Sequence, residues 1–206
     1  IGNVDNMATE LKAIVAEKLG VRALEVVPMI VAHHSVAEWF QRAGSDGAVP
    51  WFAKVFVDGR DRSDELDLVG LMAESSARIR TVPQEQRTAA SGVKSILAVL
   101  NDSGTYIHSA GPLGMPGGWP ARIWADRLEL VPVPDLDMDA AMAMAMAGQR
   151  KGGIEAIETD GTIVATATCR DMMRELFDVD VSRIAPKNVE GTARALRAAF
   201  DRRKTI

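Results

Sequence analysis

The order of the predicted helices and strands constrains the fold of this chain more than any single motif does. Segments with helical periodicity and short strand-like segments follow one another without a regular strand–helix–strand alternation. Regular alternation is typical of a parallel sheet with crossover helices. We therefore expect an α+β fold in which antiparallel strands pack with long helices.

Apolar residues at helical spacing predict the helices, and short β-branched or apolar runs bounded by turn residues predict the strands. The predicted helices span residues 6–19, 35–42, 63–79, 83–100, 138–149, 170–177 and 188–202. Strands are expected at 24–32, 51–57 and 105–109, with hairpins at 121–133 and 154–166. Asp5 or Asn6 is positioned to cap the first helix. Pro28 predicts an edge position or a bulge for its strand.

Composition restricts the class of protein and its partners. The 206 residues, of which 47% are hydrophobic, can build a core, and we expect one domain over 1–206. A net charge of -4 and a pI near 5.5 predict binding neither to nucleic acid nor to anionic membranes. One cysteine, no membrane-spanning run and no signal peptide after Ile1 predict a soluble cytoplasmic protein.

Two of the three histidines, His33 and His34, lie where the strand at 24–32 ends. An imidazole moves protons near neutral pH, and an upstream carboxylate such as Asp5 could orient it. Since neighbouring residues of a strand point to opposite faces, the two histidines are not equivalent. In the alternative interpretation Asp5 only caps a helix and His34 is a hydrogen-bonded residue at a strand end.

Other candidate sites have weaker support from the sequence. His33, His34 and His108 could ligate a transition metal, but adjacent strand residues diverge and no Cys/His spacing supports a metal site. The glycine-rich segment 111–118 lacks the lysine and Ser/Thr of a P-loop, so we expect a connector. Cys169 has no neighbouring partner that would activate a nucleophile.

Three short segments resemble the start of the catalytic domain of lactate and malate dehydrogenases. They are Gly2-Asn3-Val4-Asp5, the helix end Glu17-Lys18-Leu19-Gly20-Val21, and Ala32-His33-His34-Ser35. The small residues at 89–93 and the helix that continues to 102 are similar to the long helix of that domain. The similarity covers residues 1–150 and leaves 151–206 as an extension with a hairpin and helices.

The resemblance implies a function for part of the chain. His34 aligns with the family's proton-transferring histidine and Asp5 with its orienting aspartate, so the chain would be the catalytic half of an NAD(P)-dependent oxidoreductase acting on a hydroxy or oxo compound. Lys12, Asn3 and Ser91 are the predicted substrate-binding residues. NAD or NADP would be held mainly by a Rossmann half expected upstream, and no cofactor-binding residue is assigned here. The expected partners are a small-molecule substrate and either a second copy, as in a dimer, or a partner Rossmann domain.

The chain departs from the family at several positions. Ala8 stands where the family has its substrate-carboxylate arginine, and Ala32 and Ser35 replace two glycines. Lys12, two helical turns beyond Asp5, is the predicted substitute for that positive charge. Two other functions stay open: an NAD- and metal-dependent glycosidase of the same superfamily, and a non-catalytic oligomerisation domain.

Overall fold

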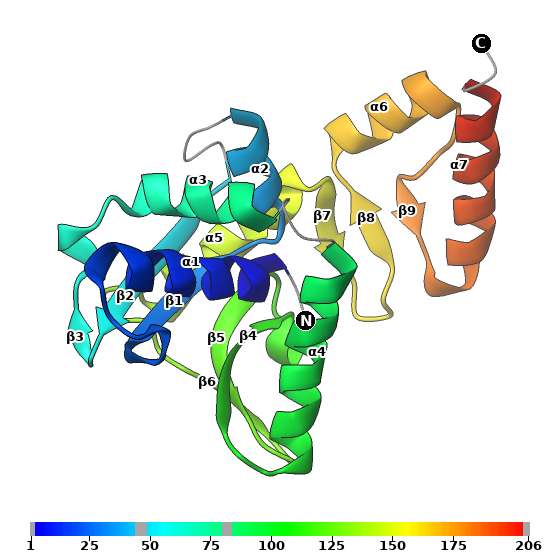
Figure 1. The fold of residues 1–206 in the computed structure, drawn as a ribbon. Coiled ribbons are helices and arrows are strands. Elements are labelled where there is room, and N and C mark those ends of the chain that lie inside the picture. Colours follow the sequence, from blue (N-terminus) through cyan, green and yellow to red (C-terminus); the bar gives the residue numbers. More distant parts are fainter. Residues whose placement is uncertain (1–2, 44–48, 80–83, 204–206) are drawn as a thin grey trace. The chain divides into compact units, whose positions relative to one another are not determined.

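The structure, a computed structural model, describes residues 3–43, 49–79 and 84–203 (Figure 1). Its contacts divide the chain into two compact units, Ile1–Gly148 and Gln149–Ile206. The boundary lies close to residue 150, where the resemblance to the dehydrogenases ends. The single domain over 1–206 stays a prediction.

The first unit is built on an antiparallel sheet. Its strands are β1 (Val26–Ala32), β2 (Trp51–Val57), β3 (Arg60–Asp61), β4 (Thr105–Ala110), β5 (Gly118–Ile123) and β6 (Leu128–Leu130). They pair in the order β3-β2-β1-β5-β4, with β6 also paired to β5, and every described pair is antiparallel. The predicted α+β class is confirmed.

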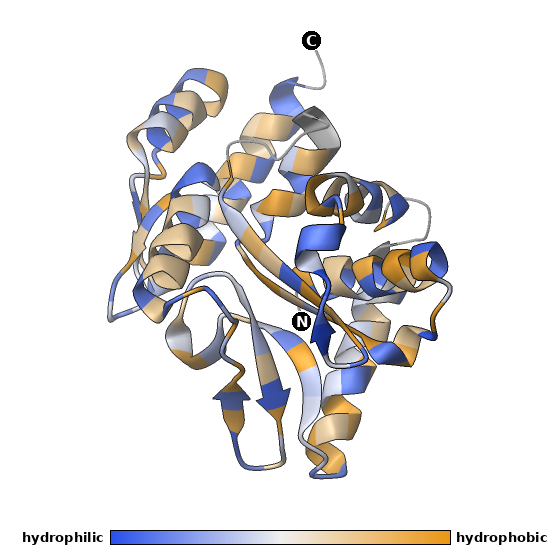
Figure 2. Cartoon of the chain, turned by 90° about the vertical axis from the view of Figure 1, so that its left-hand side faces the viewer, coloured by the Kyte–Doolittle hydropathy of each residue, from blue (hydrophilic) through white to orange (hydrophobic). Residues whose placement is uncertain are grey.

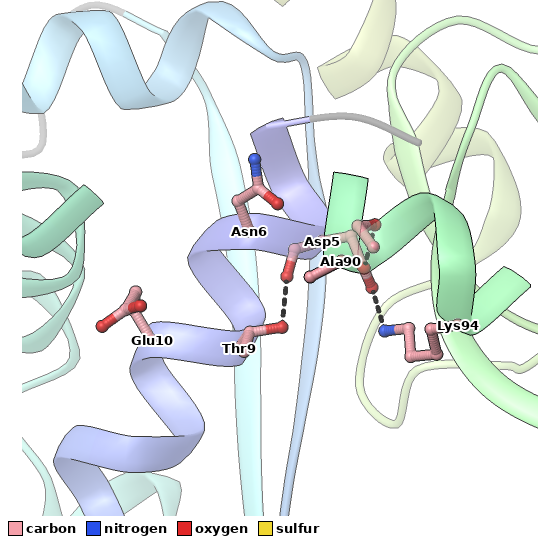
Figure 3. A pocket seen from close by; sticks show the side chains of 7 residues that line it. Asp5, Asn6, Thr9, Glu10, Ala90 and Lys94 are labelled. Atoms are coloured by element: carbon pink, nitrogen blue, oxygen red, sulfur yellow. Dashed lines mark hydrogen bonds and ion pairs between the residues drawn. The ribbon is translucent and has the colours of Figure 1, made fainter. Parts of the chain in front are cut away.

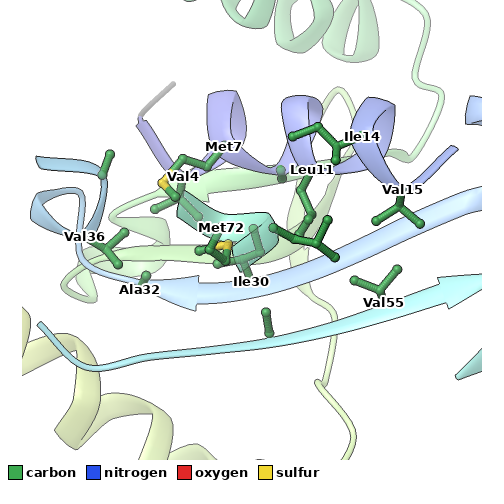
Figure 4. Close-up of a cluster of buried hydrophobic side chains, with 14 of the residues drawn as sticks. Val4, Met7, Leu11, Ile14, Val15, Ile30, Ala32, Val36, Val55 and Met72 are labelled. Carbon is green, nitrogen blue, oxygen red and sulfur yellow. The ribbon is translucent and has the colours of Figure 1, made fainter. Parts of the chain in front are cut away.

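Helices cover both faces of this sheet. They are α1 (Asn3–Leu19), α2 (Ser35–Ala43), α3 (Leu68–Ile79), α4 (Gln84–Leu100) and α5 (Met138–Lys151). The helix α1 lies along β1 and buries Met7, Leu11 and Ile14 against it and against α3 (Figure 4). The opposite face of β1 presents Met29 and Val31 to α5. Burial on both faces explains why β1 is almost uniformly apolar.

Pro28 does not mark an edge or a bulge, as the sequence predicted. β1 lies between β2 and β5, and Pro28 pairs with Val55 in an unbroken register. The Val55 N–H bonds to Ser63 and its carbonyl accepts from Arg62, so both groups face away from β1. The proline therefore occupies a pair that exchanges no main-chain bonds, and its missing N–H removes no bond to β2.

β1 and β5 are paired at one position only among the described residues, Ala32 with Gly118. Beyond it, side chains from β4 replace the main-chain bonds. The ring nitrogen Nε2 of His108 accepts from the Ile30 N–H at 3.0 Å, and the Tyr106 hydroxyl donates to the Pro28 carbonyl at 2.9 Å. These two side chains tie β4 to β1.

The second unit contains a three-stranded antiparallel sheet and two helices. The elements are β7 (Ile154–Ile157), β8 (Ile163–Ala165), α6 (Ala167–Phe177), β9 (Arg183–Ile184) and α7 (Val189–Arg203), with strand order β7-β8-β9. The predicted hairpin at 154–166 corresponds to β7 and β8. The two-residue β9 has no periodicity that could have predicted it.

Two predicted helix starts differ from the structure. The helix expected at 63–79 is divided into a 3-10 turn, Ser63–Glu65, and α3. Asp67, just before α3, accepts a hydrogen bond from the Gly70 N–H through its carboxylate. The first helix already begins at Asn3, so Asp5 and Asn6 lie inside it and neither is its N-cap. No helix in the described part of the chain is long and apolar enough to cross a membrane.

The helices are amphipathic, with hydrophilic and hydrophobic residues side by side along them (Figure 2). On α4, large apolar side chains also face solvent. Val93, Ile96, Leu97 and Leu100 recur at helical spacing and are all more than half exposed. We call these four residues the α4 stripe.

We expect Leu11→Ala to lower the free energy of unfolding of the first unit by about 2–5 kcal/mol, because Leu11 is 0% exposed between α1 and the sheet. Urea denaturation followed by tryptophan fluorescence measures it, since all four tryptophans lie in this unit. The matched control is Leu24→Ala at an 83% exposed position, which should change stability by less than about 0.5 kcal/mol. Equal losses in the two variants would contradict the assigned core.

Candidate functional site

The carboxylate of Asp5 joins three elements of the first unit. It lies in the first turn of α1 and is buried. Its Oδ2 accepts from the hydroxyl of Ser91 at 2.6 Å, and its Oδ1 accepts from Lys94 Nζ and from the His108 main-chain N–H, each at 2.9 Å. Ser91 and Lys94 lie one turn apart on α4, and His108 lies on β4. All three donors come from residues 86 or more positions away.

These donors keep Asp5 ionised. Burial by itself raises the pKa of the carboxyl, but the hydrogen bonds from Ser91, His108 and Lys94 and the charge of Lys94 outweigh it. The pKa of Asp5 is therefore lowered from its ordinary value of 3.8. A negative charge and its counter-ion sit side by side at neutral pH.

A pocket of about 310 Å³ opens beside this ion pair (Figure 3). Residues from α1 and α4 line it: Asp5, Asn6, Thr9, Glu10, Ala90, Ser91 and Lys94. The side chain of Lys94 is 35% exposed, so its ammonium group is reached from the pocket. The volume is at the small end of the range for ligand sites, which fits a small molecule.

His108 is buried next to Asp5 and is not among the residues that line the pocket. Because Nε2 accepts from Ile30, the neutral ring carries its proton on Nδ1, which lies 3.9 Å from Asp5 Oδ1. The edge of the ring meets Tyr106, with 5.5 Å between ring centroids. Burial lowers the pKa of His108 to about 4, although Asp5 opposes the shift. His108 is thus a neutral, buried part of the framework, a role that sequence reasoning missed.

The two adjacent histidines differ in burial, but strand alternation is not the reason, because both follow the end of β1 at Ala32 and do not point to opposite faces of the sheet. His33 is buried and its Nδ1 lies 2.8 Å from the hydroxyl of Ser35, while the His34 side chain is exposed. The two rings touch, with centroids 4.1 Å apart. Burial and then the neighbouring His34 lower the pKa of His33 to about 4. A side chain at Gly148 of α5 would collide with His33, so the backbone of α5 packs closely here.

Asp5 and His34 belong to segments that meet at one glycine. Gly118 pairs with Ala32, two residues before His34, and a Cβ at Gly118 would lie 2.7 Å from Val4, the residue before Asp5. Figure 4 shows Val4 and Ala32 at the same end of the cluster. No hydrogen bond or ion pair joins Asp5 to His34 among the described residues. The orienting contact between them stays a prediction.

The other predicted site residues are only partly brought together. The structure places Ser91 on Asp5 and in the pocket lining. Lys12 is not among the residues that line this pocket, where Lys94 supplies the ammonium group instead. The side chain of Asn3 lies outside the described residues. Within the described ranges, no group of three His, Cys, Asp or Glu residues could hold a metal ion.

Comparison with known proteins supports the resemblance at the level of the fold. The malate dehydrogenase of Plasmodium falciparum, solved in complex with NADH, is 15% identical over 73% of this chain and 53% of its own, with a TM-score of 0.51. The Aeropyrum pernix malate dehydrogenase is 16% identical over 72% of this chain and 50% of its own, with a TM-score of 0.49. This chain thus spans about half the length of these enzymes. No protein-family model and no curated protein matches the sequence.

We expect the stability of the first unit to fall as pH is lowered from 7 to about 5, because His33 and His108 resist protonation in the folded state. The unfolded chain binds these protons near pH 6.5, so the stability is fully present above that pH and is lost toward pH 4. Down to pH 5 the loss should reach about 2 kcal/mol per histidine.

His108→Gln keeps an acceptor for the Ile30 N–H and cannot be protonated in this range. Urea denaturation at a series of pH values should give a shallower decline for this variant than for the native chain. Identical declines would show that His108 takes up no proton on unfolding.

Proposed function

We propose that this chain is the catalytic half of an NAD(P)-dependent oxidoreductase that acts on a hydroxy or oxo compound. The observation that carries the proposal is the ionised Asp5 with Ser91 and Lys94 at the wall of a small pocket, in a fold similar to that of malate dehydrogenases. Asp5 is also the residue that the sequence resemblance aligns with a catalytic aspartate. Fold likeness at 15% identity by itself carries no activity.

His34 is the proposed proton donor and acceptor. His33 and His108 are buried and hydrogen-bonded through ring nitrogens, whereas His34 is exposed at the turn that follows β1. An imidazole is the side chain most often used for general acid–base catalysis, and an exposed one can be reached by a substrate. In the proposal, His34 gives a proton to a carbonyl oxygen of the substrate in one direction and removes it from the hydroxyl group in the other.

Asp5 acts in this proposal mainly as a positioning residue. Its described side-chain hydrogen bonds go to Ser91, Lys94 and the main chain of His108, which fixes the pocket wall. The negative charge at the start of α1 is also favoured by the helix dipole. The direct contact with His34 that the resemblance implies would need one of these bonds to be shared.

The described residues do not themselves fit a dinucleotide. Rossmann halves bind it at the carboxyl ends of parallel strands, whereas all paired strands here are antiparallel. A nicotinamide cofactor would therefore be held mainly by a Rossmann half other than these residues. This chain would contribute the substrate pocket and the proton.

A non-catalytic oligomerisation domain is the second candidate. The α4 stripe favours it. Its four large apolar side chains are exposed on one helix, and a group of exposed apolar side chains often marks a protein–protein interface. Its expected partner is a second copy of the chain. No described metal-ligand group favours the glycosidase alternative.

The two candidates differ in their prediction for His34→Gln. In the full assembly that contains this chain, the substitution should lower kcat/KM for NAD(P)-coupled turnover by about 10²–10⁴-fold, because a general acid/base contributes that much. The melting temperature should stay unchanged because the side chain is exposed. Undiminished turnover would remove His34 from the reaction and favour the oligomerisation domain.

A further inference from the structure

Asn6 lines the pocket, and its side-chain amide is accessible there, since among the described residues only Arg62 Nε is a buried side-chain polar atom without a partner. It is 5% exposed and lies next to Asp5 on α1. Its side-chain amide makes no hydrogen bond to any described residue. An accessible amide without a protein partner can bond to water or to a ligand in the pocket. The amide offers two donors and one acceptor.

Lys94 has hydrogen-bond donors that no described residue uses, while its positive charge is compensated by Asp5. Its ammonium group carries three donors, and one described bond uses one of them, to Asp5 Oδ1 at 2.9 Å. The ionised Asp5 compensates its positive charge at that distance. Among the described lining residues there is no further lysine, arginine or histidine. Ala8 stands where the resemblance places a substrate-binding arginine.

These observations restrict the group that the pocket can recognise. The pocket lining already contains two carboxylates, Asp5 and Glu10, and one ammonium group, so a ligand carboxylate would add a further negative charge, which is unfavourable in a partly buried site. A hydroxyl, carbonyl or amide group meets no such opposition. It finds the Asn6 amide, the spare donors of Lys94 and the hydroxyl oxygen of Ser91.

We infer that the pocket beside Asp5 recognises an uncharged hydroxy or oxo group of its ligand, and that Asn6 is the specificity-determining residue. The inference rests on the proposed function for the reacting group, a hydroxyl or a carbonyl, and adds that the neighbouring part of the substrate is neutral. The amide of Asn6 then pairs with the ligand. The ion pair between Asp5 and Lys94 is kept.

Two probes that differ in charge alone test this inference. Lactamide and lactate share the 2-hydroxy group, and lactamide carries an uncharged amide where lactate has a carboxylate. Binding of each to the full 206-residue chain, without cofactor, is measured by NMR titration at neutral pH. Lactamide should bind at least fivefold more tightly than lactate, about the effect of one modest charge interaction. Tighter binding of lactate, or no binding of either probe, would overturn the inference.

Asn6→Ala tests the assigned residue. It should weaken lactamide binding by about tenfold, the effect of losing one hydrogen-bonded partner. Its melting temperature should not fall, because the amide makes no bond to a described residue in the free chain and alanine favours a helix. A residue with a merely structural role would show the reverse: lower stability and unchanged binding, which would contradict the assignment.

Lys12→Met is the matched control on the same helix. Since Lys12 does not line the pocket, the affinity for lactamide should be unchanged. A tenfold loss in this variant would place the ligand near Lys12 and overturn the inference. These titrations need no turnover, so they can fail while His34→Gln still abolishes activity, and can succeed where it does not.

Discussion

The hydrogen bonds of the Asp5 carboxylate connect α1, α4 and β4, three elements of the first unit between which α4 makes few other contacts. α4 shares few contacts with α1 or with β4, far fewer than α1 shares with α3 or β1. One buried charge with donors from Ser91, Lys94 and the His108 main chain joins all three. The imidazole ring of His108 extends this connection to β1, because its Nε2 accepts from the Ile30 N–H. An unpaired carboxylate at this buried position would lower the stability of the fold, so the loss of one donor would also weaken the contacts made through the others.

The same arrangement limits the chemistry of the site. A carboxylate that is saturated by three donors is a poor proton acceptor but a rigid support. In the proposed function, proton transfer therefore belongs to the exposed His34, whereas Asp5 and Lys94 form the pocket wall. His34 is not among the residues that line the pocket, so this division places the proposed proton transfer and the pocket wall on separate parts of the first unit.

Much of the fold could be predicted from periodicity, because α1, β1, β2, α4 and α5 have clear patterns of apolar residues. Asp5 and Ser91 were predicted as site residues from short motifs, and the structure joins them. Lys94 was missed, since its contact with Asp5 spans 89 positions and leaves no local signal, and Asn6 was considered only as a helix cap. The prediction for Pro28 was wrong. A proline in a central strand is tolerated at a pair without main-chain hydrogen bonds, and the sequence alone does not distinguish this position from one on an edge strand.

The side-chain bridges from β4 to β1 have a consequence for how this sheet can change. Main-chain ladders persist through almost any substitution, since every residue but proline carries the same donor and acceptor. Here one main-chain pair, Ala32 with Gly118, and two side chains, Tyr106 and His108, connect β1 to the neighbouring strands β5 and β4. A single substitution at Tyr106 or His108 can therefore remove one of the hydrogen bonds between β4 and β1. The link between β4 and β1 therefore depends on which residues stand at positions 106 and 108, whereas the order of the strands rests on main-chain pairing.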